Sequence, residues 1–420
     1  MEKIINRKQT IKSSSFFKKL VIKYLKQYDN GFLEMKTDNG ATLSFGDPNS
    51  ETRASIVIND SSFFKKVFMS GDIGFAESYM DGDWSSPDLK SLFLWAISNI
   101  ENSGIISGSK KRNYQINILS FLNKVIHGFN ANTIDGSKKN ISYHYDLSNK
   151  FYELMLDPTM TYSCAVFKGT TDLEQAQLKK YELITKALNI KNGDRILEIG
   201  FGWGGFANYL NDNFNNCEYL GVTISREQFE FAKSKINSEK TKENVINFEF
   251  MDYRNIKGNF DKVVSIEMIE AVGHDNYPEY FNKISNLLEK DGVATIQAIT
   301  SPDSRYEQIR KGSDFIQKHI FPGSLLPSIR AITNACTENE LHIFEIKDIG
   351  IHYANTLNHW YNRFTNNWNK TEELGFNQTF KRKWSYYLKY CEAAFQTRNI
   401  STQQITFIKP NNTTHALTEA

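Results

Sequence analysis

Residues 196–205 read Ile196-Leu197-Glu198-Ile199-Gly200-Phe201-Gly202-Trp203-Gly204-Gly205. The apolar run at 195–199 is typical of a buried strand, and residues 206–210 follow a helical pattern. Glycine adopts backbone angles that a Cβ forbids, and it lets a ligand approach the backbone closely. We therefore predict a strand, a glycine-rich ligand-binding turn and a helix in immediate succession.

The spacing of the glycines and one acidic residue indicate which ligand this turn binds. Gly200, Gly202 and Gly204 are followed by another glycine, so the spacing is not the dinucleotide fingerprint G-x-G-x-x-G. Glu198 precedes the first glycine by two residues, and its carboxylate suits the amino group of S-adenosylmethionine. The motif favours S-adenosylmethionine, and a purely structural turn is the alternative.

A second predicted strand, 218–222, ends in polar residues that suit a ribose. In a doubly wound sheet the loop after the second strand meets the ribose of a bound nucleotide. Thr223, Ser225 and Gln228 supply hydroxyl and amide groups in this loop. Capping of the helix predicted at 229–236 explains Thr223 or Ser225 equally well.

Three further strands are predicted at 247–251, 262–266 and 293–299, each with polar residues at or near its carboxyl end. Asp252 is expected to accept a hydrogen bond from the adenine amine, and Tyr253 to stack on the ring. Open α/β sheets bind ligands at this edge. The predicted fold class is therefore α/β, with a Rossmann-like catalytic domain.

The composition of the chain limits which classes of protein it can belong to. The chain has 420 residues, of which 40% are apolar and 23% charged, so it is long enough for two globular domains. Its four cysteines lie far apart without metal-ligand spacing, so we expect no metal, no disulfide framework and a reducing cytoplasm. Residues 1–15 lack the apolar core of a secretory signal, and no run of about 18 apolar residues exists to span a bilayer.

The positive charge is concentrated at the front of the chain. The net charge is only +2, which argues against a nucleic-acid partner, yet residues 1–139 carry 19 Lys and Arg against 14 Asp and Glu. Residues 16–26 alternate Phe, Leu and Ile with Lys in the manner of a basic amphipathic helix, which can lie on an anionic membrane surface. An ordinary packed helix with a solvated lysine face is the alternative.

The polarity of the chain predicts four regions. These are a smaller N-terminal α+β domain that associates with lipid or membrane (1–100), a linker (101–139), the catalytic domain (140–410) and a polar tail (411–420). The front domain is predicted to contain strands at 32–36, 42–45 and 54–58 and a helix at 88–96.

From about Tyr143 to Pro410 the chain resembles the cyclopropane-fatty-acid synthase family, which includes the mycolic acid cyclopropane synthases. The segments that carry the resemblance are 143–149 (YHYDLSN), 156–165 (LDPTMTYSCA), the Gly200 turn, 221–225 with Gln228, 270–273 (EAVG), 320–323 (IFPG), 326–328 (LPS), Tyr353 with Thr356, Leu357 and Trp360, and 391–395 (CEAAF). Residues 71–84 resemble the N-terminal domain of the longer bacterial members. The resemblance also implies a homodimer.

The resemblance implies transfer of a methylene group from S-adenosylmethionine to a cis double bond of an unsaturated phospholipid, at the inner membrane surface of the cytoplasm. The alkene attacks the sulfonium methyl, and a bound bicarbonate then removes a proton so that the cyclopropane ring closes. The residues that the resemblance assigns to the bicarbonate are Cys164 (by its backbone), Glu270, Gln297, Ile299 (by its backbone) and Tyr353. Glu270 as the general base is the alternative within this mechanism.

The chain departs from the best-known family members at two of these positions. Gln297 stands where they have His, and it can donate a hydrogen bond but cannot carry a proton. Ala271 stands where many have His after the glutamate. Cys391 is a further candidate catalytic residue by resemblance, although the helical pattern of 386–395 predicts a structural cysteine.

For S-adenosylmethionine, the resemblance implies Tyr162 and Ser163 at the methionine end and Tyr253 and Arg254 beside the adenine. Three alternative functions are a related lipid C-methyltransferase giving methyl-branched or methylene products, which Gln297 keeps open; an amine N-methyltransferase; and a non-catalytic lipid-binding protein.

Overall fold

The computed structural model describes residues 16–100, 148–236 and 243–415. The chain divides into two compact units. Unit 1 comprises Met1–Phe129, Ser304–Ile320 and Glu372–Asn399, and unit 2 comprises Asn130–Asp303, Phe321–Thr371 and Ile400–Ala420. The predicted linker at 101–139 and most of the motif at 143–149 lie outside the described residues.

Unit 1 contains a four-stranded sheet in the order β2-β1-β3-β4. The strands are β1 (Phe32–Lys36), β2 (Thr42–Gly46), β3 (Arg53–Ile58) and β4 (Trp84–Ser85), and the helices of this unit include α2 (Ser62–Met80), α3 (Leu89–Ser98), α11 (Tyr306–Lys311), α12 (Phe315–His319) and α16 (Gln378–Gln396). The predicted strands and helix are all present, and Asp88 caps α3 by accepting from the Ser91 N–H at 3.2 Å. The α+β character expected of the front domain is observed.

The grouping of 304–320 and 372–399 with the front of the chain differs from the predicted division, which placed both in the catalytic domain. Helix α16 packs on α3 through an edge-on contact of Phe93 with Tyr386, whose ring centroids are 4.8 Å apart. The buried carboxylate of Glu392 also accepts from Lys90 of α3 at 2.7 Å. This grouping results from contacts between segments that are distant in the sequence, so local sequence patterns do not predict it.

Unit 2 contains a seven-stranded sheet in the order β10-β11-β9-β8-β5-β6-β7. Its strands are β5 (Arg195–Ile199), β6 (Glu218–Thr223), β7 (Val245–Phe250), β8 (Phe260–Ile266), β9 (Leu288–Thr300), β10 (His342–Asp348) and β11 (Ser401–Ile408). Strands β5 to β9 pair in parallel, whereas β11 pairs antiparallel with both β9 and β10. The order reverses between β5 and β8, and such a switch point opens a crevice at the carboxyl ends of the strands.

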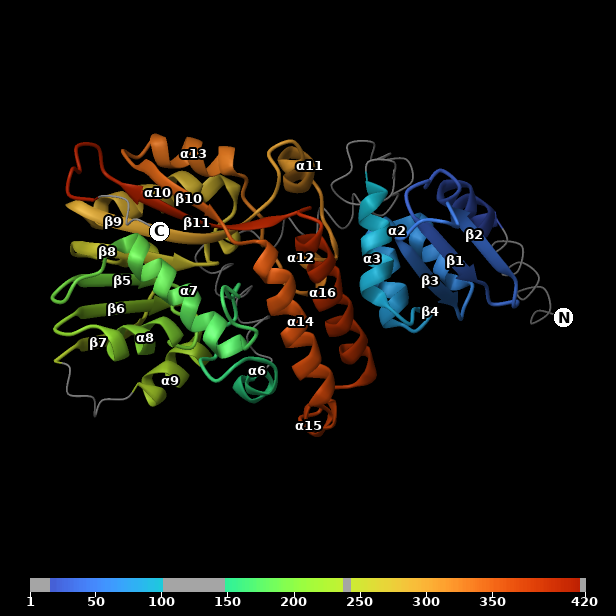
Figure 1. Cartoon of the computed structure of the whole chain (residues 1–420), viewed down its shortest axis with the longest axis horizontal. Helices are drawn as coiled ribbons and strands as arrows, with labels where there is room; N and C mark the ends of the chain where they lie inside the picture. The colour runs from blue at the N-terminus through green and yellow to red at the C-terminus, as the bar shows by residue number, and fades with distance from the viewer. Residues whose placement is uncertain (1–15, 101–147, 237–242, 416–420) are drawn as a thin grey trace. The chain divides into compact units, whose positions relative to one another are not determined.

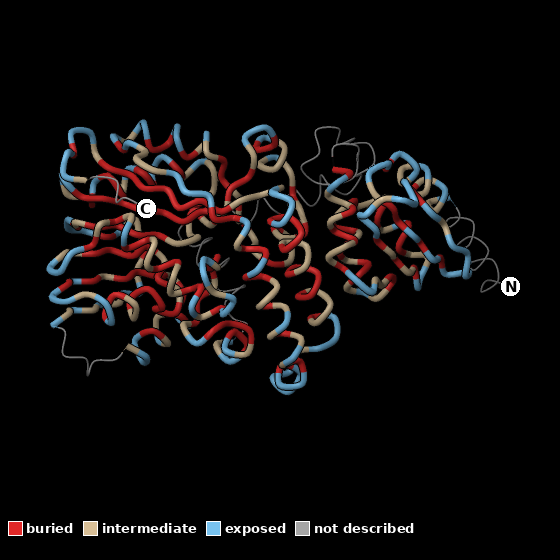
Figure 2. The backbone as a smooth tube through the Cα atoms, viewed as in Figure 1, coloured by how far each residue is buried: buried red, intermediate tan, exposed pale blue. Residues whose placement is uncertain are grey.

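Helices cover both faces of this sheet, and its central strands are buried (Figure 2). The helices of unit 2 are α6 (Asn149–Met155), α7 (Leu173–Leu188), α8 (Gly205–Asn213), α9 (Arg226–Lys235), α10 (Tyr277–Leu287), α13 (Ile329–Thr337) and α14 (Ile351–Asn366), and α15 (Trp368–Glu373) begins in unit 2 and ends in unit 1. Side chains of β5 alternate between the faces, so Leu197 and Ile199 pack with Phe281 of α10 while Ile196 packs with Tyr181 of α7. The Rossmann-like fold predicted from the sequence is confirmed.

In the part of the chain that the structure describes, every helix is too short or too polar to cross a bilayer.

Candidate active site

The glycine turn lies at the carboxyl end of β5, as the sequence predicts. Gly200 has φ +83°, Gly202 +57° and Gly204 +88°, all in the left-handed region that favours glycine. A Cβ added to Gly200 would come within 2.9 Å of Met268 Cγ. The turn therefore requires glycine for its backbone angles and, at Gly200, for a close side-chain contact.

Glu198 is buried inside the sheet on the α7 side and accepts a short hydrogen bond from the Tyr219 hydroxyl of β6. Burial raises the pKa of this carboxyl to about 8. In this structure the Tyr219 hydroxyl engages one of the two oxygens of Glu198, Oε2, and so links strands β5 and β6. Its predicted contact with the amino group of S-adenosylmethionine stays a prediction.

The three polar residues predicted to meet the ribose come together after β6. The Thr223 hydroxyl donates to Gln228 Oε1 at 3.2 Å, and Ser225 caps α9 by accepting from the Gln228 N–H at 3.4 Å. The capping interpretation of Ser225 is therefore confirmed. All three side chains are buried at the ligand-binding edge of the sheet.

Asp252 and Arg254 form a bidentate ion pair just after β7. The Asp252 carboxylate accepts from Arg254 Nε at 2.8 Å and from Nη2 at 2.7 Å. The guanidinium also lies 5.5 Å from the centroid of the Tyr253 ring. The three residues expected around the adenine are thus adjacent, and the carboxylate expected to accept from the base is engaged by Arg254.

Tyr162 and Ser163 lie in the loop between α6 and α7. The Tyr162 ring packs on Trp360, with centroids 4.9 Å apart. Ser163 Oγ accepts from the ammonium of Lys180 at 2.7 Å. Lys180, on α7, is a buried polar residue of this region that the sequence did not single out.

The centre of the site is the carboxylate of Glu267, directly after β8. Its Oε1 accepts from the Cys164 N–H at 2.9 Å and from Gln297 Nε2 at 2.9 Å, and its Oε2 accepts from the Tyr353 hydroxyl at 2.7 Å. Glu267 has φ +52°, an uncommon backbone angle for a residue with a Cβ. Strained residues cluster at functional sites, and sequence reasoning missed this one although its position at a strand end was a signal.

Gln297 is held in one orientation by its neighbour across the sheet. Gln404 of β11 donates to Gln297 Oε1 at 3.1 Å, which leaves Nε2 directed at Glu267 and, at 3.3 Å, at the Cys164 carbonyl. Gln297 is buried, so its amide is a fixed donor to the carboxylate.

Glu270 lies one turn beyond Glu267, and its Oε1 accepts a short hydrogen bond from the Ile299 N–H. Its Oε2 is buried and has no hydrogen-bond partner among the described residues. Burial, and secondly the neighbouring charge of Glu267, raise the pKa of Glu270 to about 8. Burial also raises the pKa of Glu267, but the hydrogen bonds from Cys164, Tyr353 and Gln297 oppose that shift. The two carboxyls therefore share one negative charge most readily, and Glu267 is the better placed of the two to hold it.

The two candidate cysteines differ in their surroundings. Cys164 is fully buried beside Glu267, and burial followed by the Glu267 charge raises the pKa of its thiol. Cys391 belongs to α16 in unit 1, where burial also raises the pKa of its thiol. Both environments disfavour the thiolate, which is the nucleophilic form.

The raised pKa values of Glu198 and Glu270 predict a pH-dependent stability. Between about 4.5, the ordinary value for these groups, and about 8, these two carboxyls bind more protons in the folded chain than in the unfolded chain. Their contribution to the free energy of unfolding is therefore largest below this window and is lost as the pH rises through about 8. We expect urea unfolding to show that the free energy of unfolding decreases from low to high pH in the wild type. In Glu198→Gln this decrease should be smaller by more than about 1 kcal/mol. An unchanged pH dependence in this variant would contradict the assignment.

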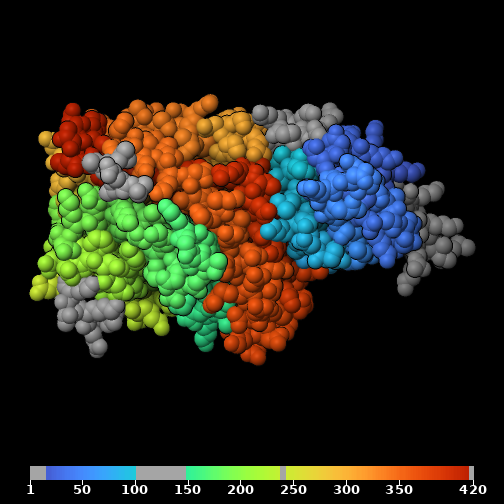
Figure 3. All heavy atoms as spheres, in the orientation of Figure 1, coloured from blue at the N-terminus to red at the C-terminus, as the bar shows by residue number. Residues whose placement is uncertain are grey.

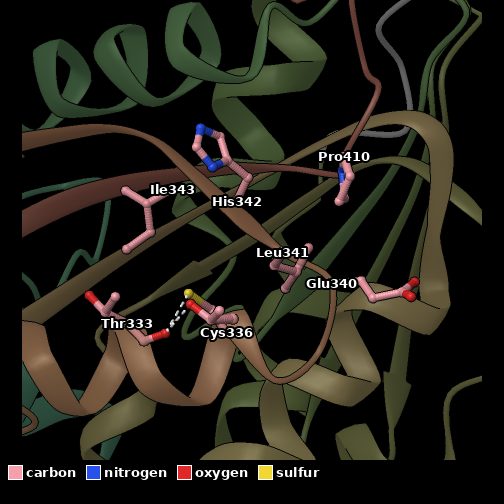
Figure 4. A pocket seen from close by; sticks show the side chains of 8 residues that line it. Thr333, Cys336, Glu340, Leu341, His342, Ile343 and Pro410 are labelled. Carbon is pink, nitrogen blue, oxygen red and sulfur yellow. Dashed lines mark hydrogen bonds between the residues drawn. The ribbon is translucent and has the colours of Figure 1, made fainter.

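One pocket lies elsewhere in unit 2, between α13 and β10 (Figure 4). It is lined by Thr333, Cys336, Thr337, Glu340, Leu341, His342, Ile343 and Pro410. None of the predicted site residues lines it, so it is separate from the site at the carboxyl ends of β5 and β8.

Comparison with known proteins identifies the family. Residues 133–405 match the family model described as mycolic acid cyclopropane synthetase. Tuberculostearic acid methyltransferase UfaA1 of Mycobacterium tuberculosis is 34% identical over 82% of this chain and 81% of its own length. Cyclopropane-fatty-acyl-phospholipid synthase of Escherichia coli is 34% identical over 86% of this chain and 89% of its own.

Solved structures agree with these relatives. Mycolic acid cyclopropane synthase CmaA1, in complex with S-adenosylhomocysteine (SAH) and CTAB, is 29% identical and covers 65% of this chain and 98% of its own, with a TM-score of 0.60. Coclaurine N-methyltransferase, at 17% identity and a TM-score of 0.58, shares the fold. The chain therefore belongs to the mycolic acid cyclopropane synthetase family and is an S-adenosylmethionine-dependent methyltransferase of the cyclopropane-fatty-acyl-phospholipid synthase type.

Proposed function

We propose that this methyltransferase moves the methyl carbon of S-adenosylmethionine onto the cis double bond of an unsaturated phospholipid acyl chain, with Glu267 as the proton acceptor. The names of the Escherichia coli and Mycobacterium tuberculosis relatives support a fatty-acyl substrate. The observation that carries the proposal is the Glu267 carboxylate, which is bound by three groups that the family resemblance assigns to bicarbonate.

Bicarbonate does not fit the site as this chain builds it. Of the assigned donors, the Cys164 N–H, the Gln297 amide and the Tyr353 hydroxyl bind Glu267, and the Ile299 N–H binds Glu270. A second anion would have to displace these carboxylates and would lie beside their charge. No step is therefore assigned to bicarbonate in this protein.

The chemistry follows from this arrangement. The alkene π electrons attack the sulfonium methyl, so a C–C bond forms, the C–S bond breaks and SAH leaves. The positive charge moves to the acyl chain, where the fixed carboxylate of Glu267 stabilises it. Loss of a methyl proton to Glu267 then closes the cyclopropane ring, with the electron pair of the C–H bond forming the new C–C bond.

A methyl-branched or methylene lipid is the second candidate product. Glu267 is anchored by its own backbone and by three hydrogen bonds, whereas a bound bicarbonate is not covalently tethered. If the anchored carboxylate lies closer to a proton on the acyl chain than to one on the new methyl, proton loss gives an alkene. Gln297 cannot relay a proton to redirect this choice.

We also propose that the enzyme works at the inner membrane surface of the cytoplasm, as a homodimer in keeping with its family. The basic segment at 16–26 supports the membrane part of this proposal. Phe16 is 58% exposed, and Lys19, Lys23 and Lys26 are exposed as well. An exposed aromatic ring among lysines suits the boundary between acyl chains and anionic head groups.

Mass spectrometry of vesicle phospholipids after incubation with the protein and S-adenosylmethionine tests the function. Monounsaturated chains are expected to gain one CH₂ unit. A product that resists mild hydrogenation is a cyclopropane, and one that still takes up hydrogen is a branched or methylene alkene. Fully saturated vesicles are the control, and the absence of any gain with monounsaturated vesicles would refute the proposed substrate.

A further inference from the structure

Helix α7 directs an unusual set of polar side chains inward. Gln177, Lys180 and Tyr181 are spaced three and four residues apart and lie on one face of the helix. All three are buried, and Gln177 and Lys180 have no measurable exposure. Other positions of α7 are partly exposed, and the helix belongs to the part of the chain whose atoms are green in Figure 3.

These side chains all bind the loop that carries Tyr162, Ser163 and Cys164. Gln177 Nε2 donates to the Ser163 carbonyl at 3.0 Å, and the Tyr181 hydroxyl lies 2.7 Å from Thr161 Oγ1. Lys180 Nζ donates to Ser163 Oγ at 2.7 Å. One helix face therefore positions the loop whose next residue, Cys164, donates its N–H to Glu267.

Lys180 stands out because a buried charge is costly unless it is compensated. None of the carboxylates in the described chain forms an ion pair with it. Its direct contacts are the hydrogen bond to Ser163 and the face of the Tyr181 ring, whose centroid is 4.2 Å from Nζ. The more distant charge of Glu267 also favours the ammonium. A methionine or leucine at this position would pack in helix α7 without that cost, so the ammonium calls for a functional reason.

The hydrogen bond between Lys180 and Ser163 can have only one donor, the ammonium of Lys180. An ammonium only donates, so Ser163 Oγ must accept from Lys180 and its own hydrogen is left to donate elsewhere. A hydroxyl that accepts from a cation is polarised and becomes a better donor to an anion. The methionine end of the cofactor carries a carboxylate, which is such an anion.

We propose that Lys180 is a positioning residue that fixes Ser163 as a hydrogen-bond donor to the carboxylate of the methionine end of S-adenosylmethionine. This inference rests on the assignment of Ser163 to the cofactor site within the proposed function. It adds the group of the cofactor that is recognised and the buried cation through which the recognition acts. Burial lowers the pKa of Lys180 to about 8, so the ammonium is the main form at neutral pH.

Calorimetric binding of two probes tests this inference. SAH carries the carboxylate, and its decarboxylated analogue lacks only that group. The wild type is expected to prefer SAH. Lys180→Met is expected to weaken SAH binding by about 10- to 100-fold, the range for a charge-assisted hydrogen bond, while binding of the analogue changes little.

Lys179→Met is the matched control, because Lys179 is the adjacent residue of the same helix and pairs with Glu182 at 2.7 Å on the partly exposed side. It should retain the wild-type preference. Equal weakening of both probes in Lys180→Met, or no weakening of either, would overturn the inference. If Lys180→Met does not fold, Ser163→Ala must lose the preference for SAH, and a retained preference would overturn it.

The result is separable from the proposed function. A wild type that binds SAH but transfers no methyl group to lipid would refute the proposed function. The role of Lys180 is tested separately, by the ratio of the affinities of Lys180→Met for SAH and for the decarboxylated analogue. Combining Lys180→Met with Ser163→Ala adds a second criterion. Because Lys180 acts through Ser163, the double variant should bind SAH about as weakly as Ser163→Ala alone, and additive losses would contradict that route.

Discussion

Replacing Glu267 with glutamine is expected to lower the rate of methyl transfer to lipid by about 1,000-fold, within the range for loss of a general base. With its amide oxygen in the Oε1 position, the glutamine still accepts from the Cys164 N–H and from Gln297 Nε2. The amide nitrogen then takes the Oε2 position and donates to the Tyr353 hydroxyl oxygen, which reverses that hydrogen bond and keeps the loop and helix in place. The amide carries no negative charge for the acyl cation and cannot accept the proton. Single-turnover transfer from labelled S-adenosylmethionine to monounsaturated vesicles measures the effect.

Glu267→Gly is the informative companion to this variant. Glycine adopts the φ of +52° without strain, and it frees the three donors that Glu267 occupies. An exogenous anion then has a place to bind, so added bicarbonate is expected to restore part of the activity in Glu267→Gly and to leave the wild type unchanged. A wild type that requires bicarbonate, or a fully active Glu267→Gln, would contradict the assigned role.

Truncating Phe281 to alanine is expected to lower the free energy of unfolding by about 3–5 kcal/mol. Phe281 lies on α10, is fully buried, and packs its ring 5.5 Å from that of Phe407 on β11. The cavity would lie between a helix and an antiparallel strand that the sheet order places beside β9. Urea unfolding followed by circular dichroism measures the change.

Asn286→Ala provides the control for this experiment, because Asn286 lies on the same helix with its side chain exposed. It donates to Asn282 at 2.8 Å, and a loss within about 0.5 kcal/mol is expected, as for surface substitutions generally. A loss of less than about 1 kcal/mol in Phe281→Ala would mean that the core between α10 and β11 is less closely packed than the structure indicates.

Much of the catalytic fold follows from local patterns. The strand at 195–199 is observed with the predicted bounds, and the turn after it has the positive φ values that its glycines favour. Ser225 caps α9 as its residue type and position suggest. These features depend on neighbours in the chain, and hydrophobic periodicity and backbone chemistry are properties of neighbours.

The antiparallel strands β10 and β11 were not predicted, and β11 is decisive for the site. It lies between β9 and β10, and its Gln404 orients the Gln297 amide from 107 residues away. The sequence alone shows Gln297 as a departure from a family histidine. Only the folded sheet shows that this amide is a fixed donor to a carboxylate.

The sequence by itself determined the Rossmann-like unit, the glycine turn and the positions of most residues around the expected cofactor. The tertiary structure decided what lies at the centre, because Cys164, Glu267, Gln297 and Tyr353 come from four separate elements. Their meeting depends on sheet order and helix packing, which a local pattern does not encode. The carboxylate of Glu267 thus takes the hydrogen bonds expected of a bound bicarbonate, because the sheet brings all three donors to it.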